Sequence, residues 1–362
     1  MRFKFKITFQ GIIYILLIGA FAYWTYSYRD QLVQILSVIQ QGVWYIILAT
    51  MLVLGIAIYN QATLYTSIYE ILDLPSTRRE MLPLYLVRRF VQVAAPSGGF
   101  SGWVPFLQFA RRRDIAVGAV FIANLIYTIL WYTTFFLFLL LGLLYLFLAH
   151  DLQWFEISAG LVILAADVVM IAGLVLAWIQ PQLLERILAW LATALGWTFV
   201  RLKRKPPLTR QQIETFGTDL TQAVRLMRTT GWTRLLVPVI HALLNETLHI
   251  FMFYLVALAF GLHISVGILV PAYSISILFF IVSPTPGGLG FVEGTLILVL
   301  TTLGVPADQA TVVTLAYRGI TFWMPFVLGF LALRWFNRYP GIDDEEDNPP
   351  VEDLPAEVKG QG

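Results

Sequence analysis

The long apolar runs of this chain decide what it can fold into. Several of them, including residues 116–149, exceed the roughly 18 to 20 residues that a helix needs to cross a bilayer about 30 Å thick. Backbone polar groups inside a bilayer must be hydrogen-bonded within the protein, so such runs favour helices. With 58% hydrophobic and 13% charged residues, the sequence predicts an all-α polytopic membrane protein and excludes a soluble globular domain.

Charge is distributed unevenly along the chain. The formal net charge is +2, but the C-terminal segment "DDEEDNPPVEDLPAEVKG" holds eight acidic residues and one lysine, so the rest carries about +9. An acidic, proline-rich segment of this kind lacks the apolar residues that build a core. We therefore expect an integral membrane domain over residues 1–338, with halves at roughly 1–205 and 206–338, and a disordered acidic tail over 339–362.

Basic residues near the ends of apolar runs mark the cytoplasmic side of a membrane protein. They place the N-terminus inside, followed by a span over residues 7–26 and a returning span over 42–65. The apolar segment 91–110 has arginines on both flanks, including Arg88 and Arg89 before it and residues 111–113 after it. A helix that spanned the membrane would place one of these two arginine groups on the outer face. We therefore predict a re-entrant hairpin that enters and leaves by the cytoplasmic face, with its turn at Pro96-Ser97-Gly98-Gly99.

The middle of the chain continues this topology. Residues 116–149 lead outward as one tilted helix or as two shorter ones, because about 34 apolar residues is long for a single span. Residues 157–179 return to the inside. Residues 181–205 are predicted to form an amphipathic helix on the inner surface.

The C-terminal half mirrors the first. Residues 235–260 lead outward and 311–335 return, so the apolar segment 264–303 must begin and end outside. We expect it to be a second re-entrant hairpin with "SPTPGG" at its tip. The whole chain then has about eight apolar segments, about six spanning helices and two inverted hairpins, with both termini in the cytoplasm and the protein in the plasma membrane.

The two predicted hairpins share a sequence pattern. Each has proline, a hydroxyl residue and a glycine pair, and each precedes a long helix that starts with x-Asp-x-Ala, at Asp114 and at Asp308. In this register Asn124 of the first copy corresponds to Arg318 of the second. Paired broken segments of opposite orientation are typical of transporters with a substrate site near the bilayer midplane. The hairpin residues expected at this site are Pro96, Gly98, Gly99, Pro284, Pro286, Gly287 and Gly288.

Three acidic residues outside the tail lie well inside predicted spans: Asp167, Glu246 and Glu293. A charge at this depth costs several kcal/mol unless it is paired or hydrated, so each is a functional candidate. For Asp167 the alternative is a structural role, in which its side chain only tethers a neighbouring helix through a hydrogen bond.

Glu293 and Arg318 are predicted to lie at similar depth and to pair. The helix that starts after Gly290 would point its free N–H groups at the midplane beside Arg318, which makes a site for a lipid phosphate. In this interpretation Glu293 releases the arginine as substrate arrives. The alternative is that the two residues form only a structural bridge.

The segment "HALLNETLH" places His241, Asn245 and His249 on one helical face, with Glu246 beside them. A zinc protease motif needs two histidines four residues apart, whereas these are eight residues, about 12 Å, apart along a helix. One ion cannot bridge them. Since the chain also lacks cysteine and any GxxxxGK[ST] loop, we expect no metal and no cofactor, and interpret the stripe as the polar lining of a cavity.

One long stretch of the C-terminal half, "SPTPGGLGFVEG" followed by "LGVPADQATVVTLAYRGITFWMPFVLGF", closely resembles the flippase-like transmembrane domain of lysylphosphatidylglycerol synthases. That domain also occurs alone in many bacterial membrane proteins. The resemblance implies translocation of a phospholipid or another lipid-linked substrate between leaflets. Its most specific letters are "GGLGFVEG" and "YRG", which include Tyr317. The full synthases continue into a soluble aminoacyl-transferase domain, whereas this chain ends in the acidic tail, so that activity is not expected.

Three functions compete for these features. A transporter of an anionic lipid explains both the buried charges and the broken helices, with membrane lipids as partners and no nucleic acid. A membrane-embedded lipid-modifying transferase that uses Asp167, Glu246 or Glu293 as a base would need a larger soluble face, and a non-transporting scaffold needs neither feature. We therefore expect a lipid flippase and not an enzyme. No ATPase motif is present, so active transport would rest on an ion gradient or the membrane potential.

Overall fold

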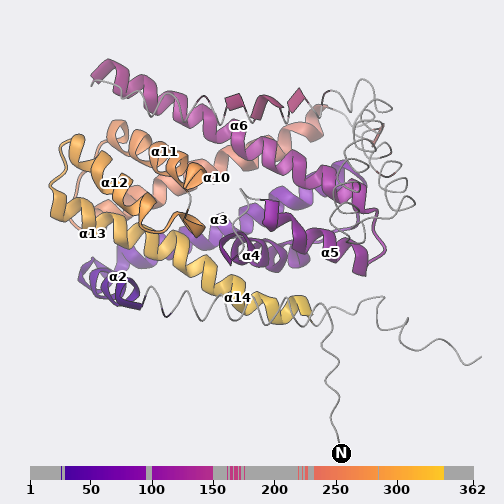
Figure 1. Cartoon of the computed structure of the whole chain (residues 1–362), viewed down its shortest axis with the longest axis horizontal. Helices are drawn as coiled ribbons and strands as arrows, with labels where there is room; N and C mark the ends of the chain where they lie inside the picture. The colour runs from indigo at the N-terminus through magenta and orange to yellow at the C-terminus, as the bar shows by residue number, and fades with distance from the viewer. Residues whose placement is uncertain are drawn as a thin grey trace, which may run out of the picture.

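The computed structural model describes residues 26, 29–94, 100–149, 232–283 and 285–337, with scattered positions between 161 and 226. All regular structure within these residues is helical (Figure 1). Four helical segments are long and apolar enough to cross a membrane: Trp44–Ile71, Val117–Tyr145, Thr233–Ala259 and Ala307–Phe336. The chain is therefore an all-α polytopic membrane protein, as its apolar runs predict.

Several predicted segments lie outside the described residues. They are the first span apart from Tyr26, most of the span 157–179, the amphipathic segment 181–205 and the tail 339–362.

Three of the predicted spans are single helices in the structure. They are α3 (Trp44–Ile71), which runs beyond its predicted end at residue 65, α6 (Val117–Ala149) and α10 (Trp232–Ala259). Because α6 is one continuous helix of 33 residues, the segment 116–149 is one long helix and not two.

The last span is built from three pieces. α13 (Ala307–Arg318) is followed by one turn of π-helix, η3 (Gly319–Trp323), and then by α14 (Met324–Asn337). Single turns of π-helix inside a longer helix occur frequently at functional sites. Here the turn directly follows Arg318.

The helix α2 (Arg29–Gln41) precedes the first described span and is not among the predicted segments. Its apolar residues recur at helical spacing, and Ile35 and Val38 are buried. A Cβ atom on Gly319 would lie only 2.5 Å from Cγ2 of Ile35. The helix α2 therefore packs directly on the π-helical turn of the last span.

Both predicted re-entrant segments are helix–break–helix hairpins. The first consists of α4 (Arg78–Ala94), η1 (Phe100–Trp103) and α5 (Val104–Arg112). The second consists of α11 (Val266–Val282), η2 (Pro286–Gly288) and α12 (Phe291–Thr302). Figure 1 shows the second hairpin at one end of the molecule, while α4 and α5 extend toward the other. Four of the predicted tip residues, Pro96, Gly98, Gly99 and Pro284, lie outside the described residues.

The two halves have the same order of elements in opposite directions. Helices α3 and α10 begin at Trp44 and Trp232, 188 residues apart, and α4 and α11 begin 188 residues apart as well. The helices α3 and α10 are antiparallel, because Val43 N donates to Ala259 O at 2.9 Å and Asn60 Nδ2 donates to His241 O at 2.8 Å. Equivalent helices that run antiparallel require inverted halves. The structure therefore contains the inverted repeat that the two hairpins predict.

The register of this repeat differs from the predicted one by one helical turn. Both α5 and α12 end in the same turn, in which the N–H of Ile115 or of Val305 donates to the carbonyl five residues earlier, at 2.9 Å. The residue before it is left-handed in each copy, Asp114 with φ 54° and Gly304 with φ 90°. Asp308, by contrast, lies in the first turn of α13. The two x-Asp-x-Ala patterns therefore occupy different structural positions.

The predicted equivalence of Asn124 and Arg318 is wrong for this reason. Helices α6 and α13 begin at residues 117 and 307, 190 residues apart. In the structural register Thr128 corresponds to Arg318, and Tyr127 corresponds to Tyr317. The sequence pattern was misleading because it matched two aspartates without reference to where each helix starts.

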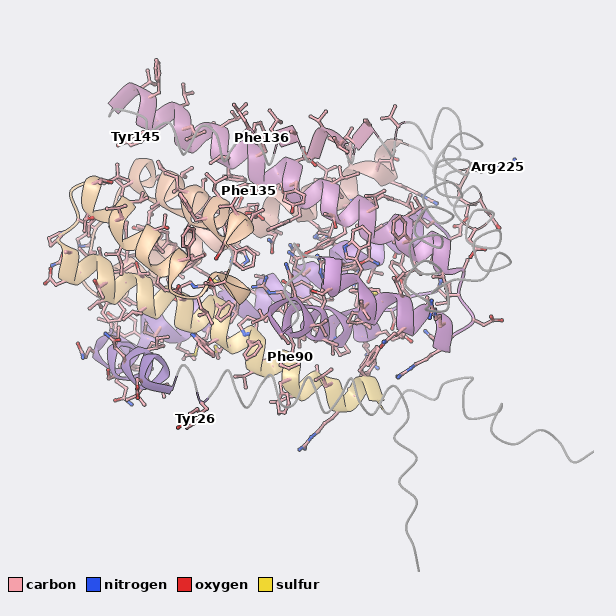
Figure 2. The ribbon with its side chains drawn as sticks, in the orientation of Figure 1. Tyr26, Phe90, Phe135, Phe136, Tyr145 and Arg225 are labelled. Carbon is pink, nitrogen blue, oxygen red and sulfur yellow. The ribbon has the colours of Figure 1, made fainter. Side chains whose placement is uncertain are left out.

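Each hairpin packs against the long helix of the other repeat. In the first pair, α4 contacts α14, and the rings of Phe90 and Phe326 stack with centroids 5.1 Å apart. In the second pair, α11 contacts α6, where a Cβ on Gly142 would lie 3.0 Å from Cα of Pro271. Figure 2 shows Phe90 beside α14, and Phe135 of α6, fully buried, toward α11. The two repeats are therefore interlocked.

The first hairpin predicts a labelling pattern. Arg79 near the start of α4 and Arg111 near the end of α5 are exposed, and the ion pair between Arg113 and Glu80, 2.6 Å long, holds these ends together. Because the chain has no cysteine, a single cysteine at either position is a clean probe. Both should react with an impermeant maleimide from the same face of sealed vesicles, the cytoplasmic one. Labelling from opposite faces would show that this segment crosses the membrane.

Candidate functional site

A cavity of about 90 Å³ lies where the two hairpins meet. Its lining includes equivalent positions of the two repeats: Tyr85 with Tyr273, and Tyr127 with Tyr317. At other equivalent positions the two repeats carry different residues. Arg88 of the first repeat corresponds to Ser276 of the second, and Gln61 corresponds to His249. The cavity therefore lies on the axis that relates the repeats. The chemical differences between the two repeats decide what it can bind.

The first repeat supplies two arginines from α4, Arg88 and Arg89. Arg88 is 6% exposed; its Nη1 donates to Tyr65 Oη, and its guanidinium lies 4.1 Å from the ring of Tyr127. A Cβ on Gly102 would lie 2.9 Å from Cγ of Arg88, so this glycine leaves room for the arginine stem. Within the described residues, neither arginine forms an ion pair. Their charges therefore have no fixed counter-charge in this part of the chain.

The prediction that Arg88 and Arg89 lie at the cytoplasmic flank is wrong, because both side chains line the cavity between the hairpins. The helix α4 begins at Arg78, so Arg88 lies about 15 Å along it at a rise of 1.5 Å per residue. A signal was present in the sequence. The break at Pro96 was expected near the midplane, and a residue only eight positions before it lies within about 12 Å of that depth.

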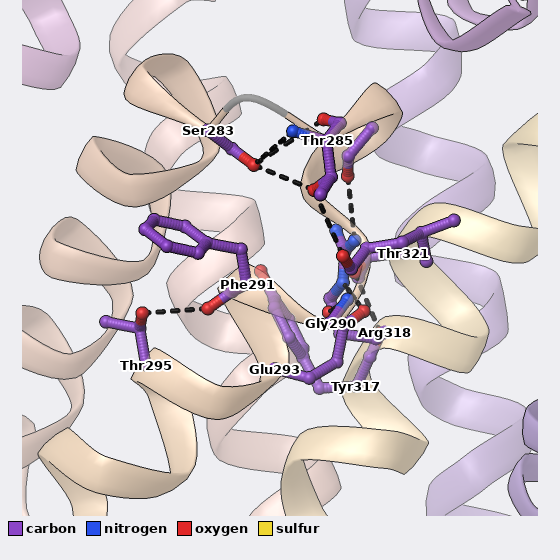
Figure 3. A network of polar contacts seen from close by, with 11 residues as sticks. Ser283, Thr285, Gly290, Phe291, Glu293, Thr295, Tyr317, Arg318 and Thr321 are labelled. Carbon is purple, nitrogen blue, oxygen red and sulfur yellow. Dashed lines mark hydrogen bonds and ion pairs between the residues drawn. The ribbon is translucent and has the colours of Figure 1, made fainter.

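Glu293 and Arg318 form the buried ion pair that their predicted depths indicate, with Glu293 Oε1 2.7 Å from Arg318 Nε. The other carboxylate oxygen, Oε2, accepts from the Gly290 N–H at 2.8 Å and caps α12. Arg318 Nη2 donates to Gly287 O at 3.0 Å, and its guanidinium lies 4.2 Å from the ring of Phe322. Figure 3 shows how this network joins the hairpin tip to the last span.

Two details of the expected site differ in the structure. Because α13 begins at Ala307 and not at Thr311, Arg318 lies about 16 Å along the helix, close to the middle of a core about 30 Å thick. The Gly290 amide at the start of α12 is already bonded to Glu293, so it is not free for a phosphate. The arginine side chains of the lining supply positive charge for binding an anion.

Glu246 faces the same cavity from α10 and is 1% exposed. Its Oε2 accepts from Tyr273 Oη at 2.5 Å, and its Oε1 accepts from Asn245 Nδ2 at 3.2 Å. His249, one turn further along α10, also lines the cavity, and its ring stacks with Tyr273 at a centroid distance of 6.3 Å. In the described part of the chain, Glu246 has no ion-pair partner. The second repeat thus contributes a carboxylate held only by neutral groups.

Three other predicted polar residues lie away from the cavity lining. His241 Nδ1 lies 2.6 Å from Asn60 Oδ1 and so contributes to the contact between α10 and α3. Asn124 Oδ1 accepts a hydrogen bond from Tyr65 Oη at 3.4 Å, and the same Tyr65 Oη accepts from Arg88 Nη1. Asp167 accepts from Thr133 of α6 at 2.9 Å, which is the tethering bond of the alternative interpretation. Among the residues that the structure describes, no group of three His, Asp or Glu side chains is placed to hold a metal ion.

The comparison with known families now places the chain. Residues 11–329 match the family described as the lysylphosphatidylglycerol synthase TM region. The chain belongs to this family. The matched residues contain both hairpins, the arginines of α4, Glu246 and the Glu293–Arg318 pair.

Curated relatives are described only as membrane proteins. A "UPF0104 membrane protein" of Methanothermobacter thermautotrophicus (strain Delta H) is 27% identical over 190 residues, which is 48% of this chain and 56% of the relative. A second match with the same description and organism is 33% identical over 89 residues, 25% of this chain and 26% of the relative. The chain thus spans about half the length of the first relative. No solved structure matches it.

The hairpin tip of this lysylphosphatidylglycerol synthase TM region depends on three left-handed glycines: Gly287 (φ 64°), Gly288 (φ 71°) and Gly290 (φ 77°). Side chains satisfy the exposed backbone of the break, because Thr285 Oγ1 donates to Leu289 O at 3.0 Å and Ser283 Oγ accepts from Thr285 N at 3.1 Å (Figure 3). Irregular backbone at membrane depth is stable only when protein or water satisfies it in this way.

Gly287→Ala should therefore destabilise the TM region by about 2 to 4 kcal/mol. A left-handed conformation costs an L-residue about 1 to 2 kcal/mol, and overpacking adds a similar amount. The added Cβ would lie 2.7 Å from the ring of Phe322 and 3.3 Å from Val93, so the tip cannot shift toward either repeat. Gly294→Ala in α12 is the matched control, since nothing lies within 4 Å of a Cβ there. Equal melting temperatures of the two variants in detergent would contradict this account of the tip.

Proposed function

We propose that this protein is a transporter that moves a lipid with an anionic, phosphate-bearing headgroup between the two leaflets. The observation that carries the proposal is the cavity between the opposed hairpins, into which Arg88 and Arg89 bring charge without an acidic partner among the described residues. Arginine binds phosphate through a planar fork of N–H donors. A bound phosphate would give these two arginines a directly paired counter-charge.

The third arginine of the cavity differs from these two. Arg318 is already paired with Glu293, so its charge is largely neutralised within the protein. We infer that Arg88 and Arg89 make the first contact with the phosphate. Arg318 completes the site from the second repeat, with Nε and Nη2 engaged and Nη1 without a hydrogen bond to any described residue.

Transport by this arrangement follows from its symmetry. A cavity of about 90 Å³ has room for a phosphate group and not for acyl chains, so the chains stay in the surrounding lipid while the headgroup passes through the protein. Inverted repeats around a central site can exchange conformations, which opens the site to each side in turn. The polar headgroup then avoids the several kcal/mol that it costs to enter the hydrocarbon core alone.

The competing functions fit the site less well. A transferase that used Glu246 or Glu293 as a base would need that carboxylate close to a second reactive group, and Glu293 is engaged on both oxygens. A scaffold gives no reason for arginines in a central cavity. We therefore keep transport, without enzymatic activity, as the proposed function. The proposal includes membrane lipids as partners, a plasma-membrane location and cytoplasmic termini.

Reconstitution tests this function directly. Purified protein in phosphatidylcholine vesicles should move a fluorescent phosphatidylglycerol probe from the inner to the outer leaflet, where dithionite bleaches it, many-fold faster than protein-free vesicles do. A fluorescent lipid of the same chain length without phosphate should not be accelerated. Equal rates with and without folded protein would reject lipid transport.

A further inference from the structure

We propose that Glu246 is a proton-binding site coupled to the lipid: it takes up one proton as the phosphate enters the cavity and releases it as the phosphate leaves. The inference rests on the proposed lipid transport and adds its energy source, a transmembrane proton gradient. The reaction is an acid–base exchange at one oxygen, in which the carboxylate and a proton give the carboxylic acid. No other bond forms or breaks.

The first observation is how the carboxylate is held. Glu246 is 1% exposed, and its two bonds within the described residues come from neutral donors, Tyr273 Oη and Asn245 Nδ2. The other buried carboxylate of this half, Glu293, is instead fixed by Arg318 at 2.7 Å. A permanently paired carboxylate stays ionised, whereas one held by neutral groups responds to charges that arrive nearby. Of these two buried carboxylates, Glu246 is therefore the one suited to exchange a proton.

The second observation is the unused oxygen of Asn245. This side chain is 3% exposed, and its Oδ1 is buried with no hydrogen-bond partner among the residues that the structure describes. The oxygen and nitrogen of an amide have nearly the same shape, so rotation by 180° exchanges their places. The nitrogen donates to the ionised carboxylate at 3.2 Å. After rotation the oxygen accepts the O–H of the protonated acid, so the same residue satisfies Glu246 in both states.

The third observation is the charge that faces Glu246 across the cavity. The cations are Arg88 and Arg89 on α4 and Arg318 on α13, and α3 contributes the neutral Gln61. The other titratable groups of the lining are His249 on α10 and the tyrosines Tyr85, Tyr127, Tyr273 and Tyr317, on α4, α6, α11 and α13. In the empty cavity the arginines favour an ionised Glu246. A bound phosphate cancels their field and adds negative charge, so it favours the protonated acid.

Calorimetry with a soluble probe separates proton uptake from transport. Dihexanoyl-phosphatidylglycerol is titrated into the detergent-solubilised full chain in several buffers of different ionisation enthalpy, between pH 5 and pH 8. The dependence of the heat on the buffer gives the number of protons taken up per bound lipid. The wild type should take up close to one proton at its maximum. Glu246→Gln should bind the lipid with no proton uptake, and Asp308→Asn, the corresponding change at an exposed carboxylate in the first turn of α13, should keep it.

Each outcome of this experiment decides a different point. Lipid binding by the wild type without proton uptake at any pH would overturn the inference and leave lipid transport standing. Absence of lipid binding would overturn both. The inference would also be overturned if a folded Glu246→Gln took up as many protons per bound lipid as the wild type, since the proton would then bind elsewhere.

A second variant covers the case in which Glu246→Gln does not fold. Asn245→Leu removes the amide that serves both protonation states and should lower the proton count at least twofold while lipid still binds. An unchanged count would contradict the role of Asn245. In proteoliposomes, an imposed pH gradient should drive lipid movement several-fold faster in the wild type and have no effect in Glu246→Gln.

Discussion

Arg318→Met should lower the free energy of unfolding by about 3 to 5 kcal/mol, the usual cost of leaving one partner of a buried ion pair unpaired, and should abolish lipid movement. Glu293 is 4% exposed and would lose the guanidinium that now lies 2.7 Å away. Gly287 O would lose its donor as well. Thermal unfolding in detergent and the vesicle assay measure the two effects separately.

A double variant distinguishes a structural pair from a functional one. Arg318→Met combined with Glu293→Gln leaves no unpaired charge, so most of the lost stability should return. Lipid movement should remain absent, because the cavity has lost a cation. Glu293→Gln alone should slow transport and keep the fold. If the double variant regains both stability and transport, the pair is only a bridge between the hairpin tip and the last span.

Arg88→Met should reduce lipid movement by roughly 30- to 1,000-fold, the equivalent of about 2 to 4 kcal/mol for a lost charge-assisted contact in a buried site. Its effect on stability should be small, within about 1.5 kcal/mol. Arg88 has no acidic partner among the described residues, so removing it strands no opposite charge there. Tyr65 Oη can still donate to Asn124 Oδ1, 3.4 Å away.

The exposed Arg79 on the same helix provides the control for this variant. Arg79→Gln removes an equal charge from the same element outside the cavity and should leave transport unchanged. Comparable losses in both variants would point to a general surface-charge effect. A folded Arg88→Met with wild-type transport would remove the arginines of α4 from the proposed phosphate site.

Much of the fold could be predicted from the sequence because its signals are local. Apolar length predicted the four described spans, and the proline and glycine clusters predicted both hairpins. At Gly287 the glycine is required by its left-handed backbone and by the closeness of Phe322. The Glu293–Arg318 pair could also be predicted, because depth along a helix follows from counting residues.

The remaining features depend on which elements meet in space. Arg88 and Arg89 appear in the sequence as an ordinary basic flank, and only the three-dimensional packing shows that they line the cavity. Asn124 was matched to Arg318 from letters, whereas the correct match with Thr128 requires the start of each helix. The role of Asn245 depends on a buried oxygen that has no partner in the described part of the chain, which no sequence pattern reports.

The interlocked packing of the repeats also bears on how the chain is made. Because α4 rests on α14 and α6 rests on α11, the half that leaves the ribosome first finds its packing partners only after the second half has been inserted. Until then the face of α4 that carries Phe90 would be open to lipid. Newly inserted N-terminal halves should therefore be substrates for membrane chaperones and proteases, and fragments split between the halves should accumulate only when both are produced in the same cell.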